Sequence, residues 1–242
     1  MIRLIVALIF TFFAVLFCLP AHFSFKAAIK KNHIDGWKKS WKFVRRFFKA
    51  LIFLSGTKVE VRGLEHLSED KPYLYVANHR SYFDVIILQT ITPGPVGFVA
   101  KKEFKKVPLL HHYMTDIGCL FLDRENPREG LKTISEATDH LKEGLSMSLF
   151  PEGRRNHEAE LLPFKAGGYR MAEKSESGVV VTAMTGMDDI FENNKPLALR
   201  KKHVIIEFAQ PVYPHELDKA ARKDFYDSIP ERIVDMQKNH QV

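Results

Sequence analysis

Seven short apolar runs that follow residue 55 constrain the fold of this chain more than any other feature. Helical patterns separate them, and the clearest covers residues 130–143, where Leu131, Ile134, Thr138 and Leu141 form one stripe. Short buried strands that alternate with helices predict an α/β domain with a central, mostly parallel or mixed sheet flanked by helices. The predicted strands are residues 58–63, 73–77, 96–100, 119–123, 146–150, 179–184 and 203–209.

The first 54 residues differ from the rest and predict an N-terminal membrane-anchoring helical segment ahead of a domain at 55–242. Residues 4–19 carry no charge, and as a helix they would reach about 24 Å, less than the roughly 30 Å of a hydrocarbon core. Continuing to Phe25 makes the segment long enough to span. A cleaved signal peptide is the alternative, because only Arg3 precedes the run and residues 19–21 form a weak cleavage site. We expect a retained anchor, with the domain on the cytoplasmic side.

The basic character of the chain is concentrated beside this apolar run. Residues 26–49 hold nine of the 36 basic residues and one of the 29 acidic ones, which leaves 27 and 28 elsewhere. A nucleic-acid partner is therefore not expected, because such proteins usually spread their charge over a folded face. Residues 37–54 predict a basic amphipathic helix on an anionic membrane surface, the alternative being a core-facing helix of the domain. Its apolar stripe is Trp37, Trp41, Val44, Phe48 and Leu51.

Neither the cysteines nor the histidines predict a metal site. The two cysteines, Cys18 and Cys119, lie in an apolar run and a predicted strand, which argues against a disulfide framework and a cysteine-rich metal site. A zinc hydrolase is a further hypothesis, prompted by His111, His112 and His157. Their spacing fits no usual ligand pattern, and adjacent histidines point to opposite sides, so we predict no metal.

Three polar side chains each follow a predicted strand: His79, Arg124 and Glu152. Functional sites in α/β sheets gather at the carboxyl ends of strands, so these three could converge on one crevice. The planar fork of Arg124 would suit an anion, although taken alone an arginine after a strand is more often a surface ion-pair partner. Glu152 lies in a Pro-Glu-Gly turn, which could also be a simple strand-exit loop with solvated charges.

His79 and Asp84 are five residues apart and cannot share one face of a helix. They meet only if His79 lies in the turn before a helix and Asp84 lies in its first turn. Ser81 is a suitable N-cap, which places Asp84 at the third helical position, close to a capping box. The stretch alone also allows the plainer interpretation, in which Asp84 is a cap partner and His79 a loop residue.

Taken together, three stretches resemble the motifs of the glycerolipid acyltransferase family, whose best-known members are the lysophosphatidic acid acyltransferases. The stretches are NHRSYFD (78–84), GCLFLDR (118–124) and FPEGRR (150–155). The resemblance covers most of residues 55–210, and AKKEF (100–104) looks like the family's lysine-bearing block. The chain departs from the family at VVVTAMTG (179–186), which lacks the proline of the usual Val-Pro-Val-like element near the acyl or acceptor pocket.

The resemblance implies a role for each matched residue. His79 would be the general base that takes a proton from the acceptor hydroxyl, and Asp84 would hold the imidazole tautomer. No nucleophilic serine is needed, since the hydroxyl itself attacks an acyl thioester, and the chain has no Gly-X-Ser-X-Gly stretch. The residues expected to position the acceptor's phosphate and glycerol are Arg124, Glu152, Gly153, Arg155 and, as a weaker candidate, Lys101.

The resemblance further implies a membrane-bound O-acyltransferase of phospholipid biosynthesis. It would move an acyl chain from a coenzyme A or acyl carrier protein thioester to 1-acyl-glycerol 3-phosphate, giving phosphatidate, with no other cofactor. Another lysolipid, such as an amino-acid-containing one, is an alternative acceptor. A non-catalytic membrane lipid-binding module is the alternative of another class, but pure binding would not need His79 and Asp84 together.

Overall fold

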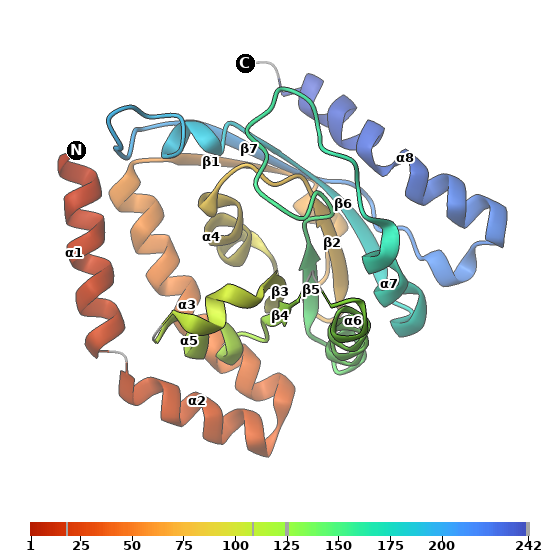
Figure 1. Ribbon diagram of the computed structural model, residues 1–242, viewed down its shortest axis with the longest axis horizontal. Helices are drawn as coiled ribbons and strands as arrows, with labels where there is room; N and C mark the ends of the chain where they lie inside the picture. Colours follow the sequence, from red (N-terminus) through yellow and green to blue (C-terminus); the bar gives the residue numbers. More distant parts are fainter. Residues whose placement is uncertain (18, 108, 124–125, 241–242) are drawn as a thin grey trace.

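A computed structural model describes residues 1–17, 19–107, 109–123 and 126–240 and contains a seven-stranded sheet with helices on both faces (Figure 1). The strand order is β1-β7-β6-β2-β5-β3-β4, and all neighbours are parallel except β6 and β7. The mixed sheet and all seven predicted strands are therefore confirmed. The strands are β1 Lys58–Arg62, β2 Tyr73–Ala77, β3 Val96–Lys101, β4 Leu120–Leu122, β5 Ser146–Leu149, β6 Gly178–Thr185 and β7 His203–Phe208.

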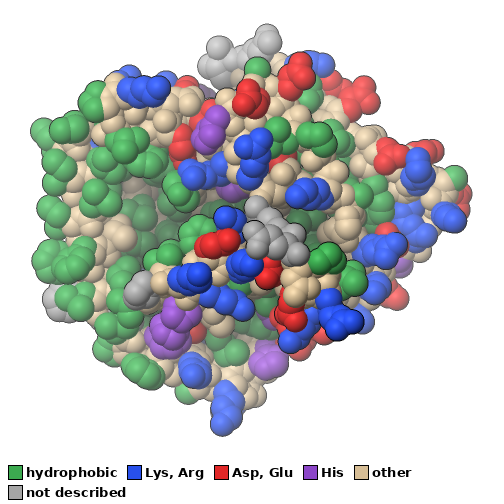
Figure 2. All heavy atoms as spheres, viewed as in Figure 1, with side chains coloured by type: hydrophobic (Ala, Val, Ile, Leu, Met, Phe, Trp, Pro, Cys, Tyr) green, Lys and Arg blue, Asp and Glu red, His purple; other side chains and the backbone are tan. Residues whose placement is uncertain are grey.

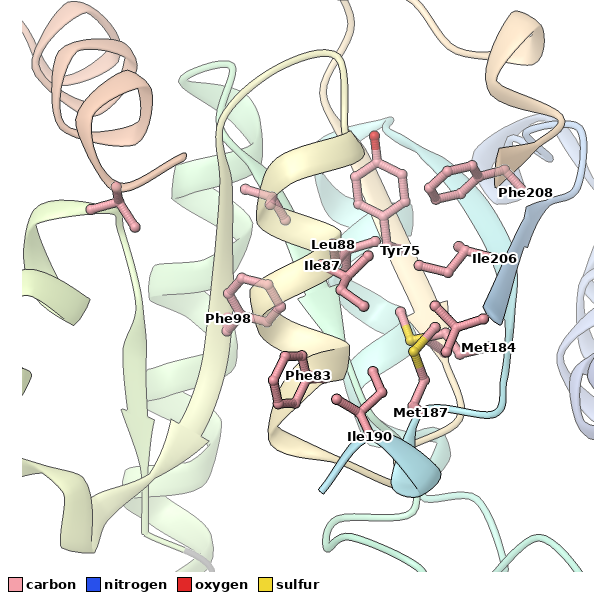
Figure 3. Packing of buried hydrophobic residues seen from close by; sticks show 14 of the residues in the cluster. Tyr75, Phe83, Ile87, Leu88, Phe98, Met184, Met187, Ile190, Ile206 and Phe208 are labelled. Atoms are coloured by element: carbon pink, nitrogen blue, oxygen red, sulfur yellow. The ribbon is translucent and has the colours of Figure 1, made fainter. Parts of the chain in front are cut away.

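Both faces of the central strand β2 are buried, because its side chains alternate between two cores. Tyr73 and Tyr75 enter one core, which α4 fills with Phe83, Ile87 and Leu88 (Figure 3). Leu74 and Val76 enter the other, which α6, α7 and α8 cover. The helices of the domain are α4 Tyr82–Ile91, α5 Leu110–Asp116, α6 Pro127–Lys142, α7 Arg170–Ser175 and α8 Lys219–Lys238.

The helix predicted at residues 130–143 is α6, but one residue of its predicted stripe faces solvent. Thr138 and Leu141 are buried and Ile134 packs at the edge of the core, whereas Leu131 is 70% exposed. Asn126 caps this helix at its N-terminus, and Pro127 occupies the first turn. The core-facing stripe therefore begins one turn later than Leu131.

Three helices form the N-terminal segment: α1 Ile2–Phe17, α2 Leu19–Lys31 and α3 His33–Ser55. The apolar stripe of α3 packs onto the domain, with Trp37, Trp41 and Val44 buried and the Trp41 indole N–H donating to the Gln89 carbonyl (3.1 Å). The predicted placement of this stripe on a membrane surface is therefore wrong, and the alternative of a core-facing helix is what we observe. The stripe packs mainly against helix α4 of the domain.

Helix α1 packs against α3 along one side and exposes apolar residues on the other. Ala7 is buried, Phe10 stacks on Phe47 with ring centroids 5.3 Å apart, and Arg3 donates to the Ser55 carbonyl (2.8 Å). Figure 2 shows hydrophobic side chains gathered on the α1 side of the molecule. Within the described ranges, no one helix has the length and apolar character to cross a membrane, but residues 2–16 and 19–31 together, bent by 56°, could do so on these two criteria alone.

Candidate active site

The loop between β2 and α4 brings His79 and Asp84 together as predicted. The Ser81 hydroxyl accepts from Phe83 N (3.0 Å), and Ser81 and Asp84 form a capping box at the start of α4. His79, two residues past the end of β2, lies 2.8 Å from Asp84, measured from Nδ1 to Oδ2. His79 therefore lies in the turn before the helix and Asp84 in its first turn, as the spacing predicts.

The Asp84 carboxylate is fully buried and fixes both the loop and the imidazole. Its Oδ2 atom also accepts hydrogen bonds from Arg80 N (2.7 Å) and Ser81 N (2.8 Å). Because a carboxylate only accepts, Nδ1 of His79 carries the proton and the Nε2 lone pair is available to take another. The imidazole also stacks on Phe150, with ring centroids 4.2 Å apart. This histidine is oriented as a general base requires.

Glu152, at the exit of β5, ties its own loop to the His79 loop. Its side chain is almost fully buried, and Oε1 accepts from His79 N (2.8 Å) while Oε2 accepts from Asn156 Nδ2 (2.8 Å) and Leu162 N (3.0 Å). Asn156 N in turn donates to the His79 carbonyl (2.7 Å). Both oxygens thus accept hydrogen bonds from the protein, so Glu152 braces the loop of His79; the contact with substrate that the sequence predicts stays a prediction.

Gly153 and Arg155 follow Glu152 on the same loop. Gly153 has φ +75°, a left-handed conformation that glycine adopts without strain, and its N–H closes a turn onto the Phe150 carbonyl (3.0 Å). The Arg155 guanidinium lies 3.8 Å from the centroid of the Tyr82 ring, at the start of α4. The Arg155 side chain is 29% exposed, and its contact with Tyr82 places it beside the first turn of the helix that carries Asp84.

Lys101 ends β3, at the same edge of the sheet where β2 and β5 end, because these three strands are parallel and neighbours. Its ammonium is about half exposed and lies 3.3 Å from a Glu103 carboxylate oxygen. The structure therefore places Lys101 near the carboxyl edge that carries His79 and Arg155. Arg124, the remaining predicted residue, lies outside the described residues.

Two residues that the sequence analysis did not predict also support the site. Asn78 links β2 to β6, because its side-chain amide donates to the Met184 carbonyl (2.9 Å) and accepts from Met184 N (2.9 Å). Glu192 accepts hydrogen bonds from the Ser81 hydroxyl (2.7 Å) and Tyr82 N (2.9 Å). Both sets of contacts join residues more than 100 positions apart, and no local pattern announces them.

The histidines that prompted the zinc hypothesis are separated in the fold. His111 and His112 lie on α5, whereas His157 lies in the loop after β5. Across the described ranges, no three histidine, cysteine, aspartate or glutamate side chains are arranged to hold a metal ion.

Comparisons with known proteins show the family and the fold of the chain. A family model described as Acyltransferase matches residues 58–185, which hold His79, Asp84 and the Glu152 loop. A solved structure, the 1-acyl-sn-glycerophosphate acyltransferase PlsC of Thermotoga maritima, has the same fold, with a TM-score of 0.77 at 22% identity, covering 98% of this chain and 96% of that one. The chain belongs to the acyltransferase family, and the resemblance predicted from its motifs is confirmed.

Several proteins with similar sequences are named as acyltransferases. A 1-acyl-sn-glycerol-3-phosphate acyltransferase of Helicobacter pylori is 31% identical over 203 residues, covering 80% of this chain and 84% of that protein. The Saccharomyces cerevisiae protein of the same name is 29% identical over 213 residues, covering 87% and 68%. The alpha form from Homo sapiens is 30% identical, and the chain spans about half (54%) of its length.

Proposed function

We propose that this protein moves an acyl chain from an acyl thioester to the free hydroxyl of 1-acyl-glycerol 3-phosphate, giving phosphatidate. The observation that carries the proposal is the His79–Asp84 pair, held at 2.8 Å between a fully buried carboxylate and an accessible imidazole. The names of the relatives from Helicobacter pylori and Saccharomyces cerevisiae support the acceptor.

The proposed chemistry is a single acyl transfer. Nε2 of His79 removes the proton of the acceptor hydroxyl as the oxygen attacks the thioester carbonyl carbon. The carbon–oxygen bond forms, the carbon–sulfur bond breaks, and the leaving thiolate takes the proton back from the imidazolium. Asp84 stabilises that imidazolium and keeps the ring in the required tautomer. The acceptor hydroxyl is itself the nucleophile, so the protein forms no covalent intermediate.

The acceptor's phosphate is assigned to Arg155, with Lys101 as a second cation on the same edge of the sheet. A guanidinium presents a rigid fork of N–H groups that matches phosphate oxygens, whereas an ammonium acts as a point charge. Gly153 shapes the loop that carries Arg155. The donor is proposed to be a coenzyme A or acyl carrier protein thioester.

Membrane attachment is part of the proposal and rests on the N-terminal helices. The outer side of α1 exposes large apolar side chains, among them Leu8 and Phe12, which a lipid phase would cover. Exposed lysines of α2 and α3 follow and would be attracted to anionic lipid headgroups. The catalytic domain would then face the cytoplasm, as the charge rule predicts.

Two substitutions test the chemistry. His79→Ala removes the base and should lower kcat by roughly 10²–10⁴-fold, and Asp84→Asn should cost about as much because it removes the charge that stabilises the imidazolium. The measurement is acyl transfer to lysophosphatidate by purified enzyme, with folding checked by thermal unfolding. Near-normal transfer by a folded His79→Ala protein would refute the mechanism.

The acceptor is tested by Arg155 variants and two lysolipids. A charge-assisted hydrogen bond contributes about 1.5–3 kcal/mol, so Arg155→Ala should lower kcat/KM for lysophosphatidate by roughly 10–150-fold. Arg155→Lys should recover only part of that, because it keeps the charge and loses the fork. A zwitterionic lysolipid should be affected much less. Equal losses on both acceptors would mean that Arg155 supports the fold or the donor.

A further inference from the structure

We propose that Glu192 is a positioning residue that holds the Arg155 guanidinium in place for the acceptor's phosphate. Glu192 lies in the segment after the short 3₁₀ helix η4 Asp188–Ile190, outside every motif that the sequence singled out. The inference rests on the proposed function, since it adds a residue that acts through Arg155 on the same acceptor.

The carboxylate of Glu192 is anchored to the start of α4. Its Oε2 atom accepts from the Ser81 hydroxyl (2.7 Å) and its Oε1 atom accepts from Tyr82 N (2.9 Å). The Glu192 side chain itself is only 8% exposed. An anion in this position also suits the positive end of the α4 dipole. The anchor fixes the carboxylate before any ligand arrives.

From this anchor, Glu192 reaches Arg155. Its Oε1 atom accepts from Arg155 Nη1 at 3.2 Å. On the other side, the guanidinium lies over the Tyr82 ring, and Nη2 donates to the Tyr82 hydroxyl (3.1 Å). One carboxylate and one aromatic ring thus fix both the direction and the plane of the guanidinium. A long arginine side chain would otherwise lose conformational freedom when it bound a phosphate.

The contacts leave the guanidinium able to bind. Of its five N–H groups, the described residues accept one from Nη1 and one from Nη2, so three are left for a ligand. The next residue, Asn156, donates its N–H to the His79 carbonyl (2.7 Å). This bond fixes the loop that carries Arg155 relative to His79. A phosphate that approaches the open side of Arg155 would therefore be placed relative to His79.

The acceptor's phosphate is not expected to displace the Glu192 carboxylate from Arg155. Leaving its position would remove the acceptor of both the Ser81 hydroxyl and Tyr82 N, in the first turn of the helix that carries Asp84. Ser81 is fully buried, and leaving its hydroxyl without an acceptor is unfavourable, so displacement would oppose binding. The geometry favours a carboxylate that stays in place while the acceptor binds to Arg155.

The test is steady-state kinetics of the full chain with lysophosphatidate at saturating acyl donor. Glu192→Ala should raise KM for lysophosphatidate by roughly 10-fold and leave kcat within about twofold, because Arg155 keeps its charge but loses its fixed position. Glu192→Gln keeps an acceptor oxygen and should raise KM by only about 2- to 4-fold. Asp189→Ala is the matched control: it removes an ion pair with Lys202 (3.3 Å) from the same segment and should leave KM unchanged.

Two further variants separate this role from a general effect on stability. In an Arg155→Ala background, Glu192→Ala should cause no further loss of kcat/KM, because its effect passes through the arginine. Tyr82→Phe removes only the hydroxyl that accepts from Nη2, on a residue that is half exposed, and should raise KM by about 3-fold. This variant is expected to fold even if Glu192→Ala does not.

Several outcomes would overturn the inference. Additive losses from Glu192→Ala and Arg155→Ala would show that Glu192 does not act through the arginine. A fall in kcat with KM unchanged would place its effect on α4 and His79, and unchanged KM in both Glu192→Gln and Tyr82→Phe would exclude a positioning role. These results differ from failure of the proposed function, which would appear as an Arg155→Ala variant that loses activity equally on lysophosphatidate and on a zwitterionic lysolipid.

Discussion

Two buried carboxylates, Asp84 and Glu152, each accept three hydrogen bonds from described residues, and between them they fix the base. A buried carboxylate is costly unless its charge is compensated, and three donors supply that compensation. Asp84 orients the ring of His79, while Glu152 holds the backbone N–H of the same residue. The histidine is thus fixed at both its side chain and its main chain.

Glu152→Gln tests whether Glu152 holds the His79 loop. Every partner of Glu152 is a donor, so the amide NH₂ of glutamine would face a donor and leave at least one buried group unpaired. We expect the free energy of unfolding to fall by about 1–3 kcal/mol and kcat to fall with KM for the acceptor unchanged. Thermal unfolding and kinetics measure the two effects.

The control for this variant is Glu160→Gln, an exposed glutamate on the same loop, which should change neither quantity. A rise in KM for lysophosphatidate with normal stability would instead support the substrate contact that the sequence predicts for Glu152. The two roles therefore separate cleanly in kcat and KM.

Residue-level prediction succeeded where the chemistry is encoded locally. His79, Ser81 and Asp84 lie within six residues, so cap propensity and helix geometry were enough to bring them together. Glu192 meets Ser81 across 111 positions, and nothing near it in the sequence distinguishes it from a solvated acid. The same limit applies to Glu152, because the sequence does not reveal whether a side chain at a strand exit turns toward solvent or under the loop.

At the scale of elements, periodicity identified the strands and helices but not what their apolar faces cover. The seven strands follow from short apolar runs bounded by turn residues. The α3 stripe is equally clear, yet a membrane and the core of a domain demand the same pattern from a helix. Long-range contacts decide between them: Trp41 reaches Gln89, and Trp37 packs on His140 with ring centroids 4.6 Å apart.

The contact between Trp37 and His140 predicts a pH-dependent attachment of α3 to α6. Burial lowers the pKa of His140 below its usual value near 6.5, while Glu143 and a hydrogen bond with the Gly118 backbone oppose that shift. The unfolded chain therefore binds this proton more readily than the folded one. The stabilisation is fully present above about pH 6.5 and is lost as the pH falls toward the lowered pKa of the folded state.

We accordingly expect His140→Gln to flatten the loss of thermal stability between pH 7.5 and pH 5. Thermal unfolding of wild type and variant over this range is the measurement. His157→Gln, at an exposed histidine, should leave the slope as it is in the wild type. Parallel curves for wild type and His140→Gln would show that other groups govern the acid sensitivity.

The whole molecule combines a compact α/β body with an N-terminal layer that is apolar on its outer side. Helix α1 is held on α3 through Phe10 and Arg3, and its buried Ala7 joins the core, so its other side faces outward. Exposed large apolar side chains gathered on one element mark an interaction surface. Exposed lysines also lie on α2 and α3, and we propose that they and the apolar side of α1 meet an anionic lipid surface.

This arrangement predicts that outward residues of α1 govern membrane attachment independently of folding. Leu8 and Phe12 are 60% and 65% exposed, and burying such a side chain in lipid contributes about 1.5–3 kcal/mol. Each aspartate substitution, Leu8→Asp or Phe12→Asp, should therefore weaken binding to anionic vesicles by roughly 10-fold or more, with the melting temperature unchanged. Vesicle co-sedimentation and thermal unfolding test the two halves of the prediction.

Two other substitutions make the test specific to this face. Leu131→Asp alters an equally exposed leucine on α6 and should leave vesicle binding intact, whereas Ala7→Asp alters the buried side of α1 and should lower the melting temperature. Raising the salt concentration should weaken binding of the wild type further, because the lysines act through screened charge. If Leu8→Asp and Phe12→Asp together left vesicle binding unchanged, a different surface would have to hold the protein on lipid, and the apolar side of α1 would need another partner.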